Sequence, residues 1–336
     1  MTLVSVLIPA YRPAFFETCV ASVMTQSHTD FELLVDDASA GGEIETILAK
    51  WDDERIEYRR ALPQAQAIPG SGRERLLDRA RGQYVKFLSD DDMLFPESLE
   101  MQLRAAEASD AKLVFSNYCF FDAAGQLLGL SEAVGKGQAE PVSSALLFQQ
   151  LLGRMNNFIG PMSNVLFEHA ALREFDTPFC IAGRRLRIHG NIAAYLNFAQ
   201  RDFKIVGLGH LGAAVRRHPG QYSHAGKPYS SAGWFEWELL LRWAIEHRRL
   251  SEAEYVPAMN ALFGAYQGAG AAYDELQLLR SLRGAPGADG FLGEAFREVL
   301  RLAYLSIDLR AQLAASAADS GASVAAVSTS PEAMRK

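Results

Sequence analysis

The chain has 336 residues, of which 49% are apolar, so it can bury a large core as one domain or as a domain with an extension. Its net charge of −7 argues against a dedicated nucleic-acid binder, which would carry a basic excess. The three cysteines, Cys19, Cys119 and Cys180, lie far apart, and this spacing argues against a disulfide framework or a zinc site.

Hydrophobic runs in the chain are short. No stretch approaches the ~20 apolar residues of a membrane span, and the apolar run at the N-terminus is too short for a signal peptide. We therefore expect a cytoplasmic protein. Any membrane contact would be peripheral, at the inner face of the membrane.

The first ninety residues alternate between short apolar runs and apolar residues at helical spacing. Strands are predicted over 3–8, 31–35, 55–58 and 84–88, with helices after Pro13, across 44–51 and across 73–81. Strands and helices that alternate at these lengths predict an α/β fold with a mostly parallel central sheet and helices on both faces.

The rest of the chain divides near residue 225. Before it, strands are predicted over 111–121, 127–128, 163–167, 203–208 and 211–215, with helices over 99–106, 141–153 and 191–201. After residue 233, apolar residues recur at helical spacing. We therefore expect an α/β domain over 1–225, an all-helical extension over 226–316 and a disordered tail over 317–336.

Two acidic clusters end separate predicted strands: Asp36-Asp37, and Asp90-Asp91-Asp92. The carboxyl ends of parallel strands face one crevice, so the two clusters would lie close together. Adjacent carboxylates repel one another, and a divalent cation relieves this because hard cations prefer oxygen ligands. The alternative is a solvated acidic turn before the next helix.

One glycine motif is rejected as a cofactor site. Residues 207–212, GLGHLG, match the dinucleotide-binding pattern, but 213–217 predict a strand rather than a helix, and no acidic residue follows about 20 positions later. A nicotinamide enzyme is therefore disfavoured. The chain also lacks a P-loop, an H-E-x-x-H motif and a G-x-S-x-G elbow.

Four stretches together resemble the inverting family 2 glycosyltransferases, which have the GT-A nucleotide-sugar fold. These are VSVLIPAYRP (4–13), VASVMTQSHTDFELLVDDAS (20–39), GRERLLDRARGQYVKFLSDDDMLFPE (72–97) and RRHPGQYS (216–223). The resemblance covers about residues 3–223. It implies that Pro9, Ala10 and Tyr11 lie along the nucleoside, that Asp37 hydrogen-bonds the base, and that Arg73 lies near the nucleotide.

The same resemblance implies a divalent metal cofactor, Mn²⁺ or Mg²⁺. The family's D-x-D-type motif falls on Ser89–Asp92. It places Asp91 at the main metal position, with Asp92 beside it and Asp90 toward the nucleotide. His218 lies in the loop that closes over the donor in relatives, which makes it a candidate metal or diphosphate contact.

The general base is where this chain departs from the family. The position of the expected aspartate is Asn191, and a neutral amide cannot usefully accept the proton. Three explanations remain open. The register is wrong by one turn; another group, such as His189, Glu168 or Asp176, acts as the base; or the protein is catalytically weak or engineered at this position.

The resemblance implies transfer of a sugar from a nucleotide diphosphate, most simply a UDP-sugar, to a hydroxyl of a surface glycan, a lipid-linked sugar or a protein. One rival is a sugar-phosphate nucleotidyltransferase, which would open with a Gly-rich basic loop instead of 9–13. The other is a nucleotide-sugar-binding protein without turnover, a hypothesis that rests on Asn191.

The helical extension carries an apolar stripe that we expect to pack as a core stripe on the α/β domain. Its members are Trp234, Trp237, Leu240, Leu241 and Trp243. The alternatives are a homodimer face or a membrane-surface patch, because basic residues lie nearby: Arg242, His247, Arg248 and Arg249.

Overall fold

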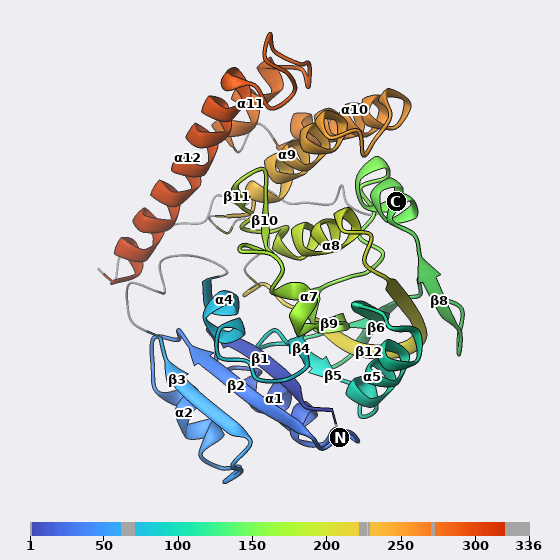
Figure 1. Cartoon of the computed structure of the whole chain (residues 1–336). Helices are drawn as coiled ribbons and strands as arrows, with labels where there is room; N and C mark the ends of the chain where they lie inside the picture. Colours follow the sequence, from blue (N-terminus) through green and yellow to red (C-terminus); the bar gives the residue numbers. More distant parts are fainter. Residues whose placement is uncertain (1, 62–70, 222–226, 228, 270–272, 320–336) are drawn as a thin grey trace. The chain divides into compact units, whose positions relative to one another are not determined.

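The computed structural model describes residues 2–61, 71–221, 227, 229–269 and 273–319 (Figure 1). The domain boundary expected at residue 225 and residues 320–336 of the expected tail lie outside these ranges. The chain forms two compact units. The first comprises Met1–Leu151, Asn156–Cys180 and Gly190–His218, and the second comprises Leu152–Met155, Ile181–His189 and Pro219–Lys336.

The first unit is built on a ten-stranded mixed sheet with the strand order β3-β2-β1-β4-β9-β6-β12-β5, in which β7 pairs with β6 and β8 with β12. The strands are β1 Val4–Ala10, β2 Phe31–Asp37, β3 Ile56–Arg60, β4 Tyr84–Phe87, β5 Met93–Leu94, β6 Leu113–Asp122, β7 Leu127–Ser131, β8 Ala139–Val142, β9 Val165–Glu168 and β12 Ile205–Arg217.

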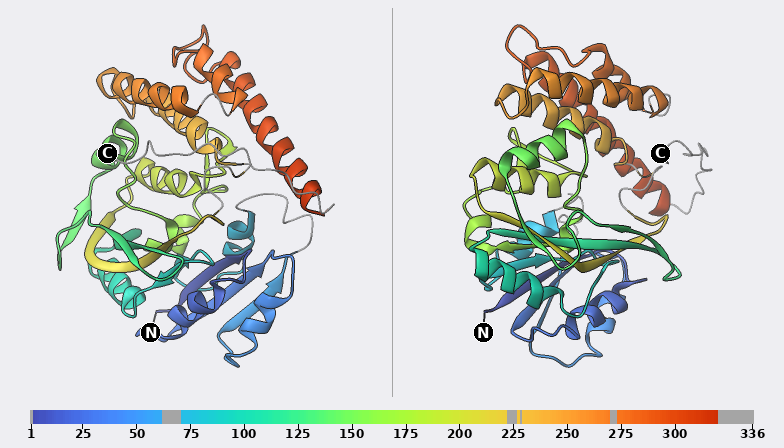
Figure 2. Two further views of the ribbon diagram at one scale, coloured as in Figure 1. Left: turned by 180° about the vertical axis from the view of Figure 1, so that it is seen from behind. Right: turned by 90° about the vertical axis from the view of Figure 1, so that its right-hand side faces the viewer.

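Helices cover both faces of this sheet (Figure 2). Alternate β1 residues, Val4, Val6 and Ile8, share a core with helices α1 Phe16–Met24, α2 Glu43–Leu48 and α5 Ser98–Ser109. Successive strand residues point to opposite faces, so intervening residues meet the other layer. That layer holds α4 Ser71–Leu77 and α8 Gly190–Gln200; the ring of Phe167 on β9 contacts Tyr195 and Phe198 of α8.

The strands that run in the same direction place their carboxyl ends at one edge of the sheet, as the sequence predicted. Strands β1, β2, β3 and β4 are parallel, and so are β6 and β12. Strand β9 is antiparallel to both β4 and β6, so β4 and β6 run in the same direction. The mostly parallel sheet is confirmed, and the acidic pair that ends β2 shares an edge with the acidic triplet that follows β4.

The prediction of two strands over 203–208 and 211–215 was wrong. A single strand, β12, spans both, and its pairing with β6 shifts register twice between Leu208 and Ala213. The glycines of the rejected motif lie inside this strand. A Cβ on Gly207 would lie 2.6 Å from the ring of Phe115, and one on Gly212 would lie 2.7 Å from Cβ of Ser116. Glycine is needed at these two positions because neighbouring side chains leave no room for a Cβ, not because the backbone binds phosphate.

Two predicted helices have different bounds. The helix expected over 141–153 is a short α-helix, α6 Ser144–Phe148, continued by a π-helical turn, Gln149–Gly153. The helix expected to end at Arg81 ends at Leu77. After it, Gly82 must approach Ser5 closely: a Cβ there would lie 2.6 Å from the Ser5 backbone nitrogen.

The second unit contains the predicted helices. They are α9 Ala232–Glu246, α10 Glu252–Ala269, α11 Asp274–Ser281 and α12 Glu294–Asp319. Of the apolar stripe, Leu240, Leu241 and Trp243 are buried. Arg242 was wrongly grouped with a surface patch: it is 1% exposed and pairs with Glu238 one turn earlier at 2.8 Å.

Within the described part of the chain, no helix is both long enough and apolar enough to cross a bilayer.

Candidate functional site

The ends of β1 and β2 bring the predicted nucleoside-side residues together. Their parallel register pairs Pro9 with Asp36 and Ala10 with Asp37. Ala10 is fully buried, whereas Tyr11, the next residue, is 37% exposed. The chain therefore leaves the sheet at Tyr11, next to the acidic end of β2, and presents an aromatic ring at its surface.

Asp37 is completely buried and held by three donors. One carboxylate oxygen accepts the backbone N–H of Ser39 at 2.8 Å, and the other accepts the Tyr58 hydroxyl at 2.9 Å and the Arg60 guanidinium at 3.0 Å. Tyr58 and Arg60 come from the neighbouring strand β3, whose pairing with β2 places them there. Sequence reasoning did not identify either of them.

The start of α4 lies against the same strand ends. A Cβ on Gly72 would lie 3.0 Å from Cβ of Pro9 and 3.4 Å from the Tyr11 hydroxyl, so glycine suits this close approach. Arg73, the next residue, lies beside the start of α8: its Nη1 is 3.6 Å from an ideal Cβ on Gly190. The structure thus brings Arg73 to both the nucleoside-side residues and the position preceding Asn191.

Asp90 fastens the loop that follows β1. One carboxylate oxygen accepts the backbone N–H groups of Tyr11 and Arg12, at 2.6 and 2.9 Å, and the other accepts Arg12 Nη2 at 3.0 Å. Burial raises the pKa of Asp90, although the guanidinium of Arg12 partly opposes this. Asp90 is therefore well placed to shape the backbone of residues 11–12.

Asp92 turns away into the fold. It is 3% exposed, and it accepts the Ser163 hydroxyl at 2.6 Å and the backbone N–H of Arg216 at 3.0 Å. Burial, followed by the adjacent charge of Asp91, raises its pKa to about 7. These contacts fix the acidic turn to β12 and to the segment before β9.

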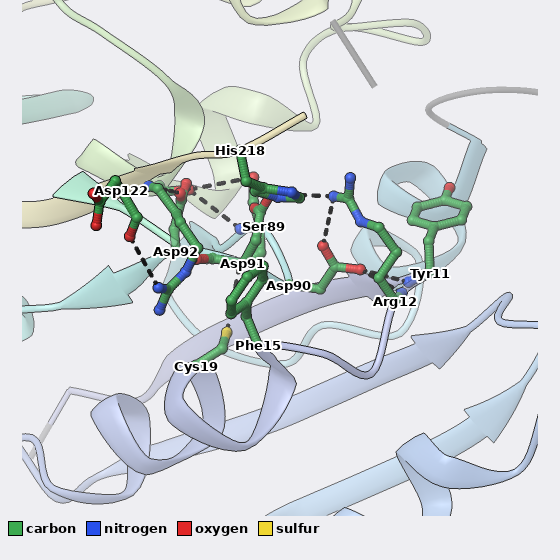
Figure 3. Close-up of polar contacts among 12 residues, drawn as sticks. Tyr11, Arg12, Phe15, Cys19, Ser89, Asp90, Asp91, Asp92, Asp122 and His218 are labelled. Atoms are coloured by element: carbon green, nitrogen blue, oxygen red, sulfur yellow. Dashed lines mark hydrogen bonds and ion pairs between the residues drawn. The ribbon is translucent and has the colours of Figure 1, made fainter. Parts of the chain in front are cut away.

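Asp91 differs from its neighbours because the side chains of Arg12 and His218 contact the same carboxylate oxygen (Figure 3). His218 Nε2 lies 3.0 Å from Asp91 Oδ2, and Arg12 Nη2 lies 3.2 Å from it. His218 directly follows the end of β12, so this contact joins the end of that strand to the acidic triplet.

Arg216, near the end of β12, supports the acidic turn. Its Nε donates to the Asp91 carbonyl at 3.0 Å, and its guanidinium lies 4.1 Å from the ring centre of Phe15 and 4.3 Å from that of Phe121. A flat guanidinium suits stacking between aromatic rings. Neither Arg12 nor Arg216 was singled out from the sequence, because basic residues signal a partner only once the fold shows which carboxylate they meet.

Asn191 lies in the first turn of α8 and uses its amide as a donor. Its Nδ2 donates to the carbonyl of Gly160 at 3.1 Å, and the Tyr195 hydroxyl, one turn later, donates to the same oxygen at 3.1 Å. Gly160 has φ +92°, and a Cβ there would lie 2.4 Å from the ring of Tyr118. The amide therefore matches a fixed carbonyl oxygen, against which an aspartate would be repelled.

The other candidate bases have different surroundings. His189 belongs to the second unit; its Nε2 donates to the Gly233 carbonyl at 2.8 Å, and burial lowers its pKa to about 4. Glu168 pairs with Tyr84 at the start of β4, the sheet edge opposite the acidic triplet, and bonds Lys112. Asp176 is exposed on the segment after α7 His169–Leu172.

The side chains of Asp91 and His218 could bind a divalent cation only together with further ligands. Asp91 and His218 offer a carboxylate oxygen and an imidazole nitrogen side by side, but across the described residues no group of three or more His, Cys, Asp or Glu side chains is arranged to hold a metal. Mg²⁺-type sites commonly use one or two carboxylates plus substrate phosphates. A cation here would need further oxygens from a bound diphosphate or from water.

The predicted GT-A fold is confirmed by comparison with a solved structure. The crystal structure of S. aureus TarS 1-349 in complex with UDP-GlcNAc matches 97% of this chain and 93% of its own, with a TM-score of 0.58 at 16% identity. At this identity the likeness establishes the fold alone. It includes the α/β sheet and the helices that follow.

Sequence comparison supplies the family. Residues 5–170 match the model described as Glycosyl transferase family 2. The putative teichuronic acid biosynthesis glycosyltransferase TuaG of Bacillus subtilis is 27% identical over 218 residues, covering 64% of this chain and 79% of that protein. The GalNAc(5)-diNAcBac-PP-undecaprenol beta-1,3-glucosyltransferase of Campylobacter jejuni is 31% identical over 140 residues, covering 41% and 44%.

Residues 5–170 therefore belong to glycosyl transferase family 2. The chain spans only 19% and 34% of the length of two other curated relatives that it matches.

Proposed function

We propose that this protein is an inverting, metal-dependent glycosyltransferase that moves a sugar from a UDP-sugar to a hydroxyl group. The observation that carries the proposal is the Asp91–His218 pair at the carboxyl end of the sheet, within one unit that also holds Tyr11, Asp37 and Arg73. The fold relative whose crystal structure contains UDP-GlcNAc supports the choice of donor.

In this proposal the strand ends hold the donor. Tyr11 would lie along the nucleoside and Asp37 would face the base, while the Arg73 guanidinium would pair with phosphate oxygens. Asp91 and His218 would hold the divalent cation, which supplies positive charge that stabilises the leaving diphosphate. As the acceptor oxygen bonds to the anomeric carbon, the bond from that carbon to the diphosphate oxygen breaks on the opposite face.

The acceptor is proposed by class only. TuaG is named for teichuronic acid biosynthesis, and the Campylobacter jejuni enzyme is named for an undecaprenol-linked glycan. We therefore propose a surface glycan or a lipid-linked sugar as acceptor, with a protein acceptor as the remaining class to test.

A second candidate function rests on Asn191. The proton released by the acceptor needs a base, and loss of a general base removes roughly 10²–10⁴-fold of the rate. Asn191 donates to Gly160 and cannot take this proton. The alternative is therefore a protein that binds a nucleotide sugar with little or no turnover.

UDP release separates the two functions. The full chain would be incubated with a panel of UDP-sugars, with Mn²⁺, Mg²⁺ or EDTA, and with glycan and lipid-linked acceptors. Metal-dependent release that requires an acceptor supports the transferase. UDP binding measured by calorimetry, without release from any donor, favours the binding protein, and equal release in EDTA contradicts metal dependence.

The variant Asn191→Asp tests the base. A higher rate of UDP release than in the wild type would show that residue 191 receives the proton. From the Gly160 contact we expect no increase, because a carboxylate cannot donate to that carbonyl. Asn191→Ala is the matched control, because it removes the same hydrogen bond without adding a charge.

A further inference from the structure

The side chain of Arg12 occupies an unusual position in the acidic turn. Its Nη2 atom lies between two carboxylates, 3.0 Å from Asp90 Oδ1 and 3.2 Å from Asp91 Oδ2. The side chain is 33% exposed, whereas those of Asp90 and Asp91 are 2% and 7% exposed. A positive charge that reaches in from the surface therefore covers two buried negative charges.

The contact with Asp91 falls on the atom that the proposed function needs. Oδ2 is the oxygen that also meets His218 Nε2, at 3.0 Å. A carboxylate oxygen has two lone pairs. Arg12 and His218 both contact this single oxygen, Asp91 Oδ2. A divalent cation held by Asp91 and His218 would have to take the place of at least one of these contacts.

The backbone of Arg12 is anchored independently of its side chain. The N–H groups of Tyr11 and Arg12 both donate to Asp90 Oδ2, at 2.6 and 2.9 Å. The guanidinium can therefore leave Asp91 by rotation of its own side chain while the loop stays in place. Asp90 would keep its two backbone donors after such a movement.

We propose that Arg12 is an internal counter-cation that competes with the divalent metal for Asp91. This inference rests on the proposed function, because it assumes that Asp91 holds the metal. Without metal, the guanidinium of Arg12 compensates the charge of the buried carboxylate, which reduces the cost of burying it. A cation held by Asp91 would displace the guanidinium, which could then meet phosphate oxygens of the donor as a planar, two-pronged donor of hydrogen bonds.

This competition has a measurable consequence, which is that Arg12 weakens metal binding in the absence of nucleotide. Two positive charges a few ångströms apart repel by an amount that corresponds to roughly a tenfold change in affinity in a partly solvated site. Removal of the guanidinium should therefore strengthen Mn²⁺ binding. A residue that merely stabilised the loop would have the opposite effect or none.

The experiment is a titration of the full chain with Mn²⁺ alone, in which free Mn²⁺ is measured by electron paramagnetic resonance. We expect Arg12→Met to bind Mn²⁺ about tenfold more tightly than the wild type, or to bind it where the wild type does not. Arg12→Lys, which keeps a positive charge, should remain within a few-fold of the wild type. Arg104→Met is the matched control, because Arg104 forms an exposed pair with Glu100 on α5.

Unchanged or weaker Mn²⁺ binding by Arg12→Met, with the thermal unfolding curve of the wild type, would overturn the proposal. If that variant does not fold, Arg12→Gln gives the same test with a side chain that still hydrogen-bonds Asp90. Failure of this proposal and failure of the proposed function give different results. A wild-type protein that releases UDP equally well in EDTA contradicts metal dependence, whereas equal Mn²⁺ affinity of the wild type and Arg12→Met contradicts only the role of Arg12.

Discussion

Buried carboxylates occur in both units of the molecule, but they are held by different kinds of donor. In the helical unit, Glu236 accepts the backbone N–H groups of Arg187, Ile188 and His189 and the hydroxyl of Tyr304. All four groups donate hydrogen bonds to the same carboxylate. Its partners are mostly backbone groups, which cannot leave without unfolding the segment that carries them.

At the sheet edge of the first unit, the donors are shared. Arg12 serves both Asp90 and Asp91, and Asp91 Oδ2 receives both Arg12 and His218. Side-chain donors can rotate away and exchange for a ligand, whereas backbone donors cannot. Burial of charge alone therefore does not mark a site. The mobility of the groups that compensate the charge is what distinguishes Asp91 from Glu236.

The largest effect should come from the carboxylate with exchangeable donors. We expect Asp91→Asn to reduce metal-dependent UDP release by roughly 10²–10³-fold, because the stabilising charge at the leaving group is lost. Steady-state rates at saturating Mn²⁺ would measure this. Asp110→Asn, on an exposed residue that pairs with Lys112, is the control. Metal-dependent turnover within a few-fold of wild type would refute the assignment of Asp91.

The carboxylate with backbone donors should affect stability instead. Glu236→Ala leaves three backbone N–H groups without their acceptor, so we expect the free energy of unfolding to fall by about 3 kcal/mol. Urea denaturation would measure the loss. Glu298→Gln changes an exposed carboxylate of α12 and should give no measurable loss. Equal stability of both variants would mean that Glu236 does not hold residues 187–189.

Lys86 is a buried basic residue that, within the described part of the chain, hydrogen-bonds a neutral amide. Lys86 on β4 is fully buried, and its Nζ donates to Gln102 Oε1 at 2.7 Å; burial lowers its pKa to about 7. In the unfolded chain the pKa is about 10.4. Between these values the unfolded chain binds more protons, so unfolding free energy should rise with pH, by at most about 1.4 kcal/mol per pH unit.

Urea denaturation at several pH values between about 7 and 10 tests this sign. The slope should be present in the wild type and absent from Lys86→Met, which cannot titrate. Below pH 7 both states of the wild type carry the proton, and the contribution of Lys86 should become constant. Parallel slopes for the two proteins would contradict the shifted pKa.

The smallest effect is expected at the surface of the helical unit. Arg242 is buried and paired with Glu238, so only the exposed Arg248 and Arg249 remain of the arginines in the proposed lipid patch. We expect reversal of both charges, Arg248→Glu with Arg249→Glu, to leave co-sedimentation with anionic liposomes unchanged. A clear loss of binding in the double variant would restore the membrane-surface hypothesis.

Local sequence patterns predicted the elements of the sheet well, because buried strands and amphipathic helices require apolar residues at a regular spacing along the chain. Strands β1, β2 and β4 are where the apolar runs placed them, and the two acidic clusters share an edge. The all-helical extension followed from the same reasoning. The register shifts within β12 were missed, because Ser116 and Phe115, which require its glycines, belong to another strand.

The chemistry of the acidic triplet was only half determined by sequence. The types and spacing of the residues marked the triplet as a candidate site, and its placement at the end of a parallel strand followed from the fold class. Only the tertiary structure decided which partners each of the three carboxylates contacts. Asp90 accepts backbone N–H groups from the loop after β1 and Asp92 accepts one from β12, whereas Asp91 meets the side chains of Arg12 and His218. Such pairings join residues about 80 to 130 positions apart, a separation that no local pattern encodes.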